Sequence, residues 1–336
     1  YSDHGMGDLI IENDTAYNIN IKIFNKLQHT ITGWPGGKPD VDDTYRPERA
    51  LPAKKKIIIF SPHPDDDVIS MGGTFLRLVD QGHEVHVAYQ TSGNIAVFDE
   101  EVVRFADFYV DLKNNYEDQP AKTNSLYKKV LQAISNKKSG EIDTDIVQNI
   151  KSLIRRGEAK AACRYVGIPD ENVHFLDMPF YETGAIEKNP IGDADIEIIT
   201  ELITAIKPDQ IYAAGDLSDP HGTHRVCLDA IFKSIESLKK SSFMSNCWLW
   251  LYRGAWQEWS VEEIEMAVPL SPSEVLRKKK AIFKHQSQKD TAVFPGSDER
   301  EFWQRAADRN QETANRYHQL GLAEYEAIEA FKRYYF

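Results

Sequence analysis

From residue 55 onward, short apolar runs alternate with amphipathic stretches, and this alternation restricts the fold more than any other feature. Runs typical of buried strands lie at residues 57–60, 84–91, 172–178, 209–215, 247–252 and 265–270. Stretches typical of helices lie at residues 66–81, 99–138, 145–166, 194–206, 222–240, 271–285 and 299–333. Strands that alternate with helices form a mostly parallel sheet with helices on both faces. We therefore expect an α/β protein, a Rossmann-like three-layer sandwich.

Residues 1–54 have a different character, with little periodicity and many Gly, Pro, Asn and Asp residues. The stretch from Ile31 to Lys56 contains four prolines and three glycines, which interrupt helices and strands alike. Residues 16–30 fit either a short strand or a helix. We expect residues 1–54 to be a linker or appendage, the tail of a missing upstream domain, and residues 55–336 to form one domain.

Composition excludes several classes of protein. The chain has 40 Lys and Arg against 52 Asp and Glu, and a net charge of −12 argues against binding to nucleic acid or to an anionic membrane surface. Three cysteines are too few for a disulfide framework. The chain has neither an apolar run long enough to span a membrane nor the pattern of a signal peptide. We therefore expect a cytoplasmic protein.

Two turns that follow predicted strands carry the residues suited to chemistry. The first is SPHPDDD at residues 61–67, and the second is DLSDPHGTH at residues 216–224. Ligands of open α/β sheets bind beyond the carboxyl ends of the strands, so we expect these turns to lie together. Imidazole and carboxylate groups are the ligands of a catalytic zinc or a similar divalent ion. Polar turns with no function are the ordinary alternative, and the pairing of two such turns disfavours it.

The two turns resemble those of the LmbE/PIG-L family of zinc-dependent N-acetylglucosaminyl deacetylases. Two further motifs match that family: Arg155 with Glu158, and the sequence HQSQ at residues 285–288. The resemblance covers residues 55–290. The whole chain is more similar still to the C-terminal half of bacterial proteins whose N-terminal half is a glucosamine-6-phosphate deaminase. This resemblance implies an upstream deaminase-like domain in the same chain.

The resemblance also implies roles for individual residues. The metal ligands would be His63, Asp66 and His224, with Zn²⁺ as the ion and Fe²⁺ as an alternative. Asp65 would be the general base that takes a proton from metal-activated water. A charged His221 would stabilise the oxyanion together with the metal.

The second turn departs from the family pattern. The family often has Pro-Asp between the two histidines, where this chain has Gly222 and Thr223. His221 therefore needs another group for its second hydrogen bond, and we expect Asp219 rather than Asp216 or a main-chain carbonyl to supply it. The departure also keeps a second hypothesis open, a sugar-sensing or regulatory domain with weak catalysis.

Five other residues are candidates for contacts with the substrate. Arg155 would bind a hydroxyl or a phosphate, although an arginine on a helix surface is an equally ordinary interpretation. The other four follow strands or lie near the sheet edge: Asp177, Ser92, Asn94 and Trp256. We expect His285 and Gln288 to belong to a polar network near the site.

The function that these residues favour is metal-dependent hydrolysis of an N-acetyl group. The substrate class is an amino sugar or amino-sugar derivative of the N-acetylglucosamine type, in free or phosphorylated form. A nucleotide-binding enzyme is disfavoured because the first turn has no Gly-x-Gly-x-x-Gly sequence.

Overall fold

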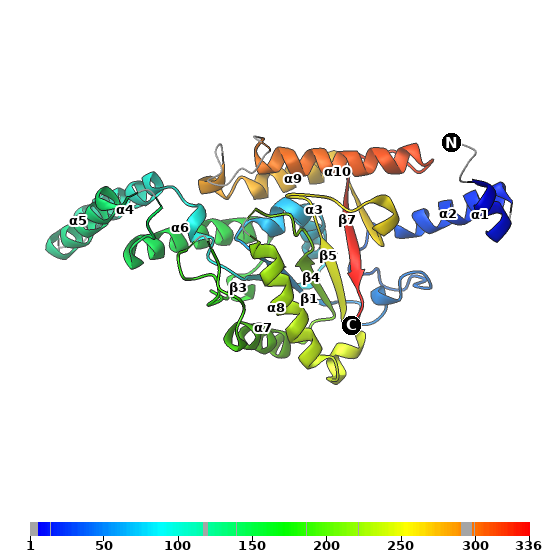
Figure 1. Ribbon diagram of the computed structural model, residues 1–336, viewed down its shortest axis with the longest axis horizontal. Coiled ribbons are helices and arrows are strands. Elements are labelled where there is room, and N and C mark those ends of the chain that lie inside the picture. Colours follow the sequence, from blue (N-terminus) through cyan, green and yellow to red (C-terminus); the bar gives the residue numbers. More distant parts are fainter. Residues whose placement is uncertain are drawn as a thin grey trace.

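A seven-stranded sheet forms the centre of the molecule (Figure 1). The computed structural model describes residues 6–13, 15–116, 120–138, 140–185, 187–220, 222–289, 298 and 300–336. The strands are β1 (Lys56–Ser61), β2 (Glu84–Tyr89), β3 (Val173–Phe175), β4 (Gln210–Ala214), β5 (Trp248–Tyr252), β6 (Met266–Leu270) and β7 (Ala327–Tyr334). Their order is β3-β2-β1-β4-β5-β7-β6, and neighbouring strands are parallel except where β7 pairs with β5 and with β6. The expected α/β sandwich is confirmed.

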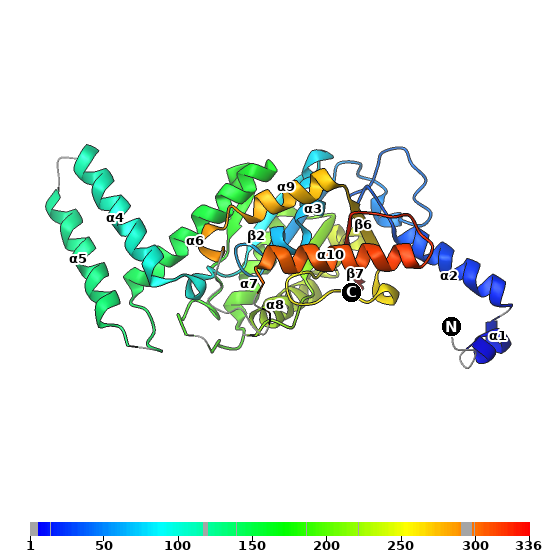
Figure 2. The same ribbon diagram turned by 90° about the horizontal axis from the view of Figure 1, so that it is seen from above.

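Helices cover both faces of the sheet (Figures 1 and 2). The helices of the described residues are α1 (Met6–Asn13), α2 (Ala16–Thr30), α3 (Asp66–Asp80), α4 (Asp99–Tyr116), α5 (Pro120–Asn136), α6 (Asp145–Val166), α7 (Asp193–Ile206), α8 (Thr223–Leu238), α9 (Pro272–Ile282) and α10 (Phe302–Gln319), and of these α1, α4 and α5 extend away from the sheet. Alternate residues of β1 point to opposite faces. Ile58 and Phe60 join the core under α7 and α8, whereas Ile57 and Ile59 join the core under α3, α6 and α9. This arrangement gives the three layers.

The C-terminal region differs most from the secondary structure expected from the sequence. The sequence pattern predicts a single helix over residues 299–333, but α10 ends at Gln319 and Ala327–Tyr334 forms strand β7. The sequence AIEAFKRY is rich in helix-favouring residues. Its pairing with both β5 and β6 determines the outcome, because a strand between two others is stabilised by its neighbours rather than by local propensity.

Strand β7 also explains a break in helix α3. Met71 has non-helical dihedrals (φ −129°, ψ 24°), which frees the amide groups of the residues that follow. The carboxylate of Glu329 on β7 accepts hydrogen bonds from the backbone N–H groups of Gly73 (2.9 Å) and Thr74 (2.6 Å). Lys278 on α9 neutralises this buried carboxylate at 2.7 Å. One buried acid therefore joins α3, α9 and the sheet.

The N-terminal region contacts the domain over part of its length. Residues 16–30 form helix α2, which resolves the choice between strand and helix. The hydroxyl groups of Thr30 and Tyr317 lie 2.8 Å apart, and Ile31 bridges to Ala267 at the edge of the sheet. The guanidinium of Arg46 lies over the ring of Trp250. Helix α1 and the start of α2 project from the body (Figure 2). The proposed boundary at residue 54 stays a prediction.

Two further findings bear on the class of protein. All three cysteines are buried and form no disulfide. Within the described residues, no helix is both long enough and apolar enough to cross a lipid bilayer.

Candidate metal centre

The two motif-bearing turns lie at the same edge of the sheet, as their positions after strands predict. β1 and β4 are parallel neighbours, with Ile57 opposite Gln210. The first turn connects β1 to α3, and the second connects β4 to α8. Hydrogen bonds shape the first turn locally: the amide of Asp67 donates to Ser61 Oγ (3.1 Å), and Ser61 Oγ donates to the carbonyl of His63 (2.6 Å).

Three side chains from these turns converge on one point. One ligand atom each from His63, Asp66 and His224 can be chosen so that all lie within 4.8 Å of one another. Asp66 Oδ2 lies 3.1 Å from His63 Nδ1 and 3.2 Å from His224 Nε2. Two imidazoles and one carboxylate around a common point are a donor set suited to Zn²⁺ with an open coordination position. The residues therefore fit a divalent metal ion.

The second nitrogen of His224 is fixed by the backbone. His224 Nδ1 lies 2.7 Å from the carbonyl oxygen of Asp216, which directs Nε2 towards Asp66. A hydrogen bond of this kind is the usual way in which a metal-binding histidine is oriented. The carboxylate of Asp216 in turn accepts from the amide of Trp256 at 2.5 Å and from that of Gln257 at 3.1 Å. The start of the second turn is thereby joined to the loop after β5.

The cluster attracts positive charge. Burial alone would lower the pKa of His224, but the adjacent Asp66 carboxylate raises it to about 10. Burial also opposes ionisation of Asp66, yet His224 and His63 hold its pKa well below the usual range. The negative charge that favours a proton on His224 also favours a metal cation between these three side chains.

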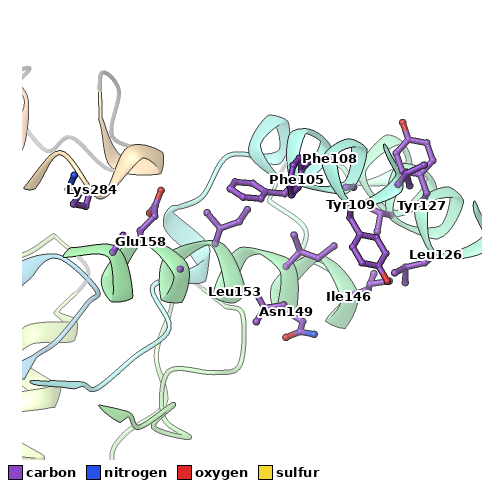
Figure 3. Close-up of a pocket in the computed structure, with 17 residues that line it drawn as sticks. Phe105, Phe108, Tyr109, Leu126, Tyr127, Ile146, Asn149, Leu153, Glu158 and Lys284 are labelled. Atoms are coloured by element: carbon purple, nitrogen blue, oxygen red, sulfur yellow. The ribbon is translucent and has the colours of Figure 1, made fainter. Parts of the chain in front are cut away.

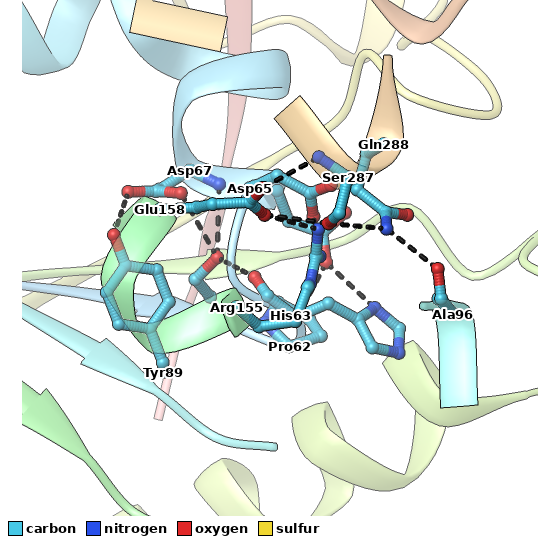
Figure 4. Close-up of polar contacts among 12 residues, drawn as sticks. Pro62, His63, Asp65, Asp67, Tyr89, Ala96, Arg155, Glu158, Ser287 and Gln288 are labelled. Carbon is cyan, nitrogen blue, oxygen red and sulfur yellow. Dashed lines mark hydrogen bonds and ion pairs between the residues drawn. The ribbon is translucent and has the colours of Figure 1, made fainter. Parts of the chain in front are cut away.

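Asp65 has different partners from Asp66 although the two are adjacent. Its carboxylate forms an ion pair with Arg155 of α6, with Nη2 and Oδ1 3.2 Å apart (Figure 4). Burial raises the pKa of Asp65, and Arg155 opposes that rise. Adjacent carboxyl groups whose pKa values move in opposite directions are typical of acid–base sites.

The five candidate substrate residues are in varied environments. Arg155 is 1% exposed, so a surface position is excluded for it. Asp177 forms an ion pair with Arg156. Ser92 donates to Glu182 through both its amide and its hydroxyl group, at 2.8 Å each. Asn94 is buried, and Trp256 is half-buried with its ring edge-on to Phe302. Their contacts with substrate stay predictions.

The expected partner of His221 is not tested, because His221 lies outside the described residues. Asp219 is buried, with 7% of its surface exposed. Gly222 directly precedes α8 and has a positive φ of 69°, a conformation that glycine adopts without strain. This conformation gives a physical reason for glycine at the position where the family often has proline.

Several residues near the site have positions that the sequence alone does not reveal. Tyr181 lies edge-on to His63 with 5.9 Å between ring centroids. Tyr89 donates to Asp67 at 3.0 Å. Glu158 accepts from the amide and the hydroxyl group of Ser287, at 2.6 and 2.7 Å. The Arg155–Glu158 and HQSQ motifs were the available signal for this last pair.

A hollow of about 570 Å³ lies between α4, α5 and α6, with Glu158 in its wall (Figure 3). Of its 17 lining residues, only Glu158 and Lys284 carry a charge. Aromatic and aliphatic side chains such as Phe105, Tyr109 and Leu153 form most of its wall. Its apolar lining distinguishes it from the polar metal centre.

Comparison with known proteins identifies the family. A family model described as PIG-L, GlcNAc-PI de-N-acetylase, matches residues 58–235, which is more than half of the chain. The chain belongs to the PIG-L family. The matched region includes both motif-bearing turns and therefore all three residues of the metal cluster.

One relative is similar in sequence over nearly the whole chain. A glucosamine-6-phosphate deaminase-like protein of Bacteroides thetaiotaomicron is 58% identical over 339 residues. The match covers 99% of this chain and 51% of the relative. The chain thus spans about half the length of that relative.

Solved structures with the same fold include enzymes of different activities. N,N′-diacetylchitobiose deacetylase from Pyrococcus horikoshii has a TM-score of 0.52 at 19% identity, covering 94% of this chain and 92% of the other. The 4-carboxy-2-hydroxymuconate hydratase GalB from Pseudomonas putida has a TM-score of 0.51 at 14% identity, covering 84% and 96%. At these identities the likeness shows the PIG-L fold alone.

Proposed function

We propose that this PIG-L protein is a metal-dependent hydrolase that removes an N-acetyl group from an amino sugar or an amino-sugar derivative. The observation that carries this proposal is the convergence of His63, Asp66 and His224 within 4.8 Å. Zn²⁺ suits this donor set, and Fe²⁺ is the alternative metal. When bound, such an ion polarises the amide carbonyl and makes water acidic enough to act as a nucleophile at neutral pH.

The side chains of the protein supply the proton transfers. Asp65 lies next to Asp66 and has a partner of opposite charge in Arg155, so it is available to accept a proton from the attacking water. The same carboxyl group can then return the proton to the leaving amine. In this proposal a charged His221 stabilises the developing negative charge on the carbonyl oxygen, and Asp219 keeps His221 charged by accepting its second hydrogen bond.

The name of the B. thetaiotaomicron relative supports an amino-sugar substrate, in free or phosphorylated form. Removing acetyl from a phosphorylated N-acetylglucosamine gives the compound on which a glucosamine-6-phosphate deaminase acts. We propose that such a domain precedes this one in a cytoplasmic protein. Arg155, Asp177, Ser92, Asn94 and Trp256 stay the candidates for contacts with the sugar.

A second candidate function is a sugar-sensing domain with weak catalysis. Gly222 and Thr223 favour it, because they replace the carboxylate that the family often places between its two histidines. Both functions require the metal cluster, and only the deacetylase requires turnover.

Two variants at adjacent positions test the proposal. We expect Asp65→Asn to retain bound zinc and to lose roughly 10²–10⁴-fold in acetate release, the usual contribution of a general base. Asp66→Asn should lose zinc as well as activity. Metal content by mass spectrometry and acetate release from N-acetylglucosamine and its 6-phosphate are the measurements. Asp229→Asn, at an exposed ion pair with Lys233 on α8, is the control.

The outcomes separate the candidates. Bound zinc without acetate release in the unmodified protein would favour the sensing domain. Equal zinc loss in both Asp65→Asn and Asp66→Asn would contradict the assigned division of roles.

A further inference from the structure

A chain of buried polar groups leads from Asp65 to the HQSQ sequence (Figure 4). Asp65 pairs with Arg155, and Arg155 Nη1 lies 3.9 Å from Glu158 Oε2. That same oxygen accepts the hydroxyl hydrogen of Ser287 at 2.7 Å. Asp65, Arg155, Glu158 and Ser287 are each less than 9% exposed. These groups are therefore one another's main polar partners.

One cation lies between two carboxylates in this chain. Arg155 is within 3.2 Å of Asp65 and at 3.9 Å from Glu158, which is ion-pair distance but too long for a hydrogen bond. Glu158 tolerates this longer separation because Ser287 donates to both of its oxygens, the amide to Oε1 and the hydroxyl group to Oε2. The position of Arg155 therefore depends on the attraction of both carboxylates, Asp65 and Glu158.

We propose that Ser287 is a positioning residue: its hydroxyl group satisfies Glu158 Oε2, so that Arg155 stays with Asp65 and holds that carboxylate in place for catalysis. The catalytic part of this inference rests on the proposed hydrolase function. Without the hydroxyl group, the guanidinium of Arg155 is the one remaining partner of Oε2 among the described residues. A movement of about 1 Å brings Arg155 Nη1 to hydrogen-bond distance from Glu158.

The position of Ser287 is also fixed by contacts other than those with Glu158. It lies in the short turn Gln286–Gln288 after α9. Gln288 in that turn donates to the carbonyl oxygen of Ala96 at 2.8 Å, which joins the turn to the segment after β2. The turn therefore has a fixed position from which Ser287 reaches α6.

The test combines a variant that removes the hydroxyl group of Ser287 with a second change that removes the charge of Glu158. Ser287→Ala removes the donor to Oε2, and we expect a fall in kcat of roughly 10- to 100-fold, as for a displaced catalytic group. Zinc content should stay within about twofold of the unmodified protein, because the metal ligands do not change, and KM should rise only if Arg155 also contacts the sugar. Ser287→Thr keeps the hydroxyl group and should retain most of the activity.

The double variant Ser287→Ala, Glu158→Gln is the decisive one. The neutral amide of glutamine no longer attracts Arg155, so we expect kcat to recover most of what Ser287→Ala loses. A hydroxyl group that merely stabilises the turn predicts the opposite, since the second change removes another native contact. Ser260→Ala breaks a hydrogen bond of the same type to Glu263, at 2.9 Å and outside this chain of groups, and is the matched control.

Crystal structures of the variants give a readout that does not depend on activity. We expect Arg155 to move from Asp65 towards Glu158 in Ser287→Ala and to return to Asp65 in the double variant. If the Arg155–Asp65 distance stays near 3.2 Å in Ser287→Ala, the inference is wrong. If the unmodified protein releases no acetate, the hydrolase proposal fails, and these distances still decide the role of Ser287. Should Ser287→Ala not fold, Ser287→Cys replaces it, because a thiol has similar size and is a weak donor.

Discussion

Replacing Glu329 with glutamine tests whether one buried acid joins three parts of the fold. Its side chain is fully buried and has three donors: the amides of Gly73 and Thr74, and the ammonium group of Lys278. Glutamine keeps the shape but offers one acceptor oxygen in place of two. At least one donor is therefore left without an acceptor, and Lys278 loses its counter-charge while only 6% of its side chain is exposed.

The expected loss of stability follows from these contacts. Removing one partner of a buried ion pair costs about 3–5 kcal/mol, because the remaining charge stays buried. A buried amide without an acceptor accounts for about 1–3 kcal/mol, and the two effects overlap. We therefore expect Glu329→Gln to lower the free energy of unfolding by about 4 kcal/mol, a large part of the usual total of about 5–15 kcal/mol.

Urea unfolding followed by tryptophan fluorescence measures this loss, with the slope of the transition compared between variants. Adding Lys278→Met to Glu329→Gln should recover about half of the loss, since the unpaired charge is then removed. Glu84→Gln is the control, because its ion pair with Lys56 spans 3.9 Å between exposed side chains. Such a pair contributes less than about 1 kcal/mol. A loss below about 1 kcal/mol in Glu329→Gln would refute the reasoning.

Two pH-dependent effects should follow from other buried groups. Burial lowers the pKa of His83 to about 4, below its value in the unfolded chain, so the stability that neutral His83 gives is lost as the pH falls from about 6.5 towards 4. The urea midpoint of His83→Asn should fall less between pH 7 and pH 5 than that of the unmodified protein, and an equal fall would contradict this. Burial raises the pKa of Glu258 to about 8, so its ionisation costs stability as the pH rises from about 4.5 to 8. Glu258→Gln should therefore be the more stable protein at pH 8 and lose that advantage at pH 5, and an advantage that persists at pH 5 would show another cause.

The parts of the fold that could be predicted are those whose sequence signal is local. The run at residues 57–60 is apolar on both faces, and β1 does lie inside the sheet, between β2 and β4. The amphipathic pattern at residues 145–166 gives helix α6 with both ends in the expected places. Gly167 ends this helix in the left-handed conformation (φ 105°), as a glycine after a helix commonly does.

The parts that could not be predicted depend on contacts between distant residues. Glu329 is surrounded in the sequence by alanine, isoleucine and phenylalanine, and nothing local shows that its carboxylate meets an interrupted helix about 255 residues earlier. The local sequence does not show the environment of Arg155 either. Its sequence fits the exposed face of a helix, whereas the structure buries it against Asp65.

The sequence DDD at residues 65–67 shows that contacts with distant residues also decide the roles of side chains within the site. The three aspartates are chemically identical and adjacent, yet each is directed to a different neighbour: Asp65 to Arg155 of α6, Asp66 to two histidines, and Asp67 to Tyr89 of β2. Burial raises the pKa of Asp67 to about 7, although the hydroxyl group of Tyr89 opposes the rise. Asp66, facing two imidazoles, stays ionised. Because each partner comes from a different element, the sheet and its covering helices determine which aspartate is suited to hold a metal ion, which to transfer a proton, and which to anchor the turn.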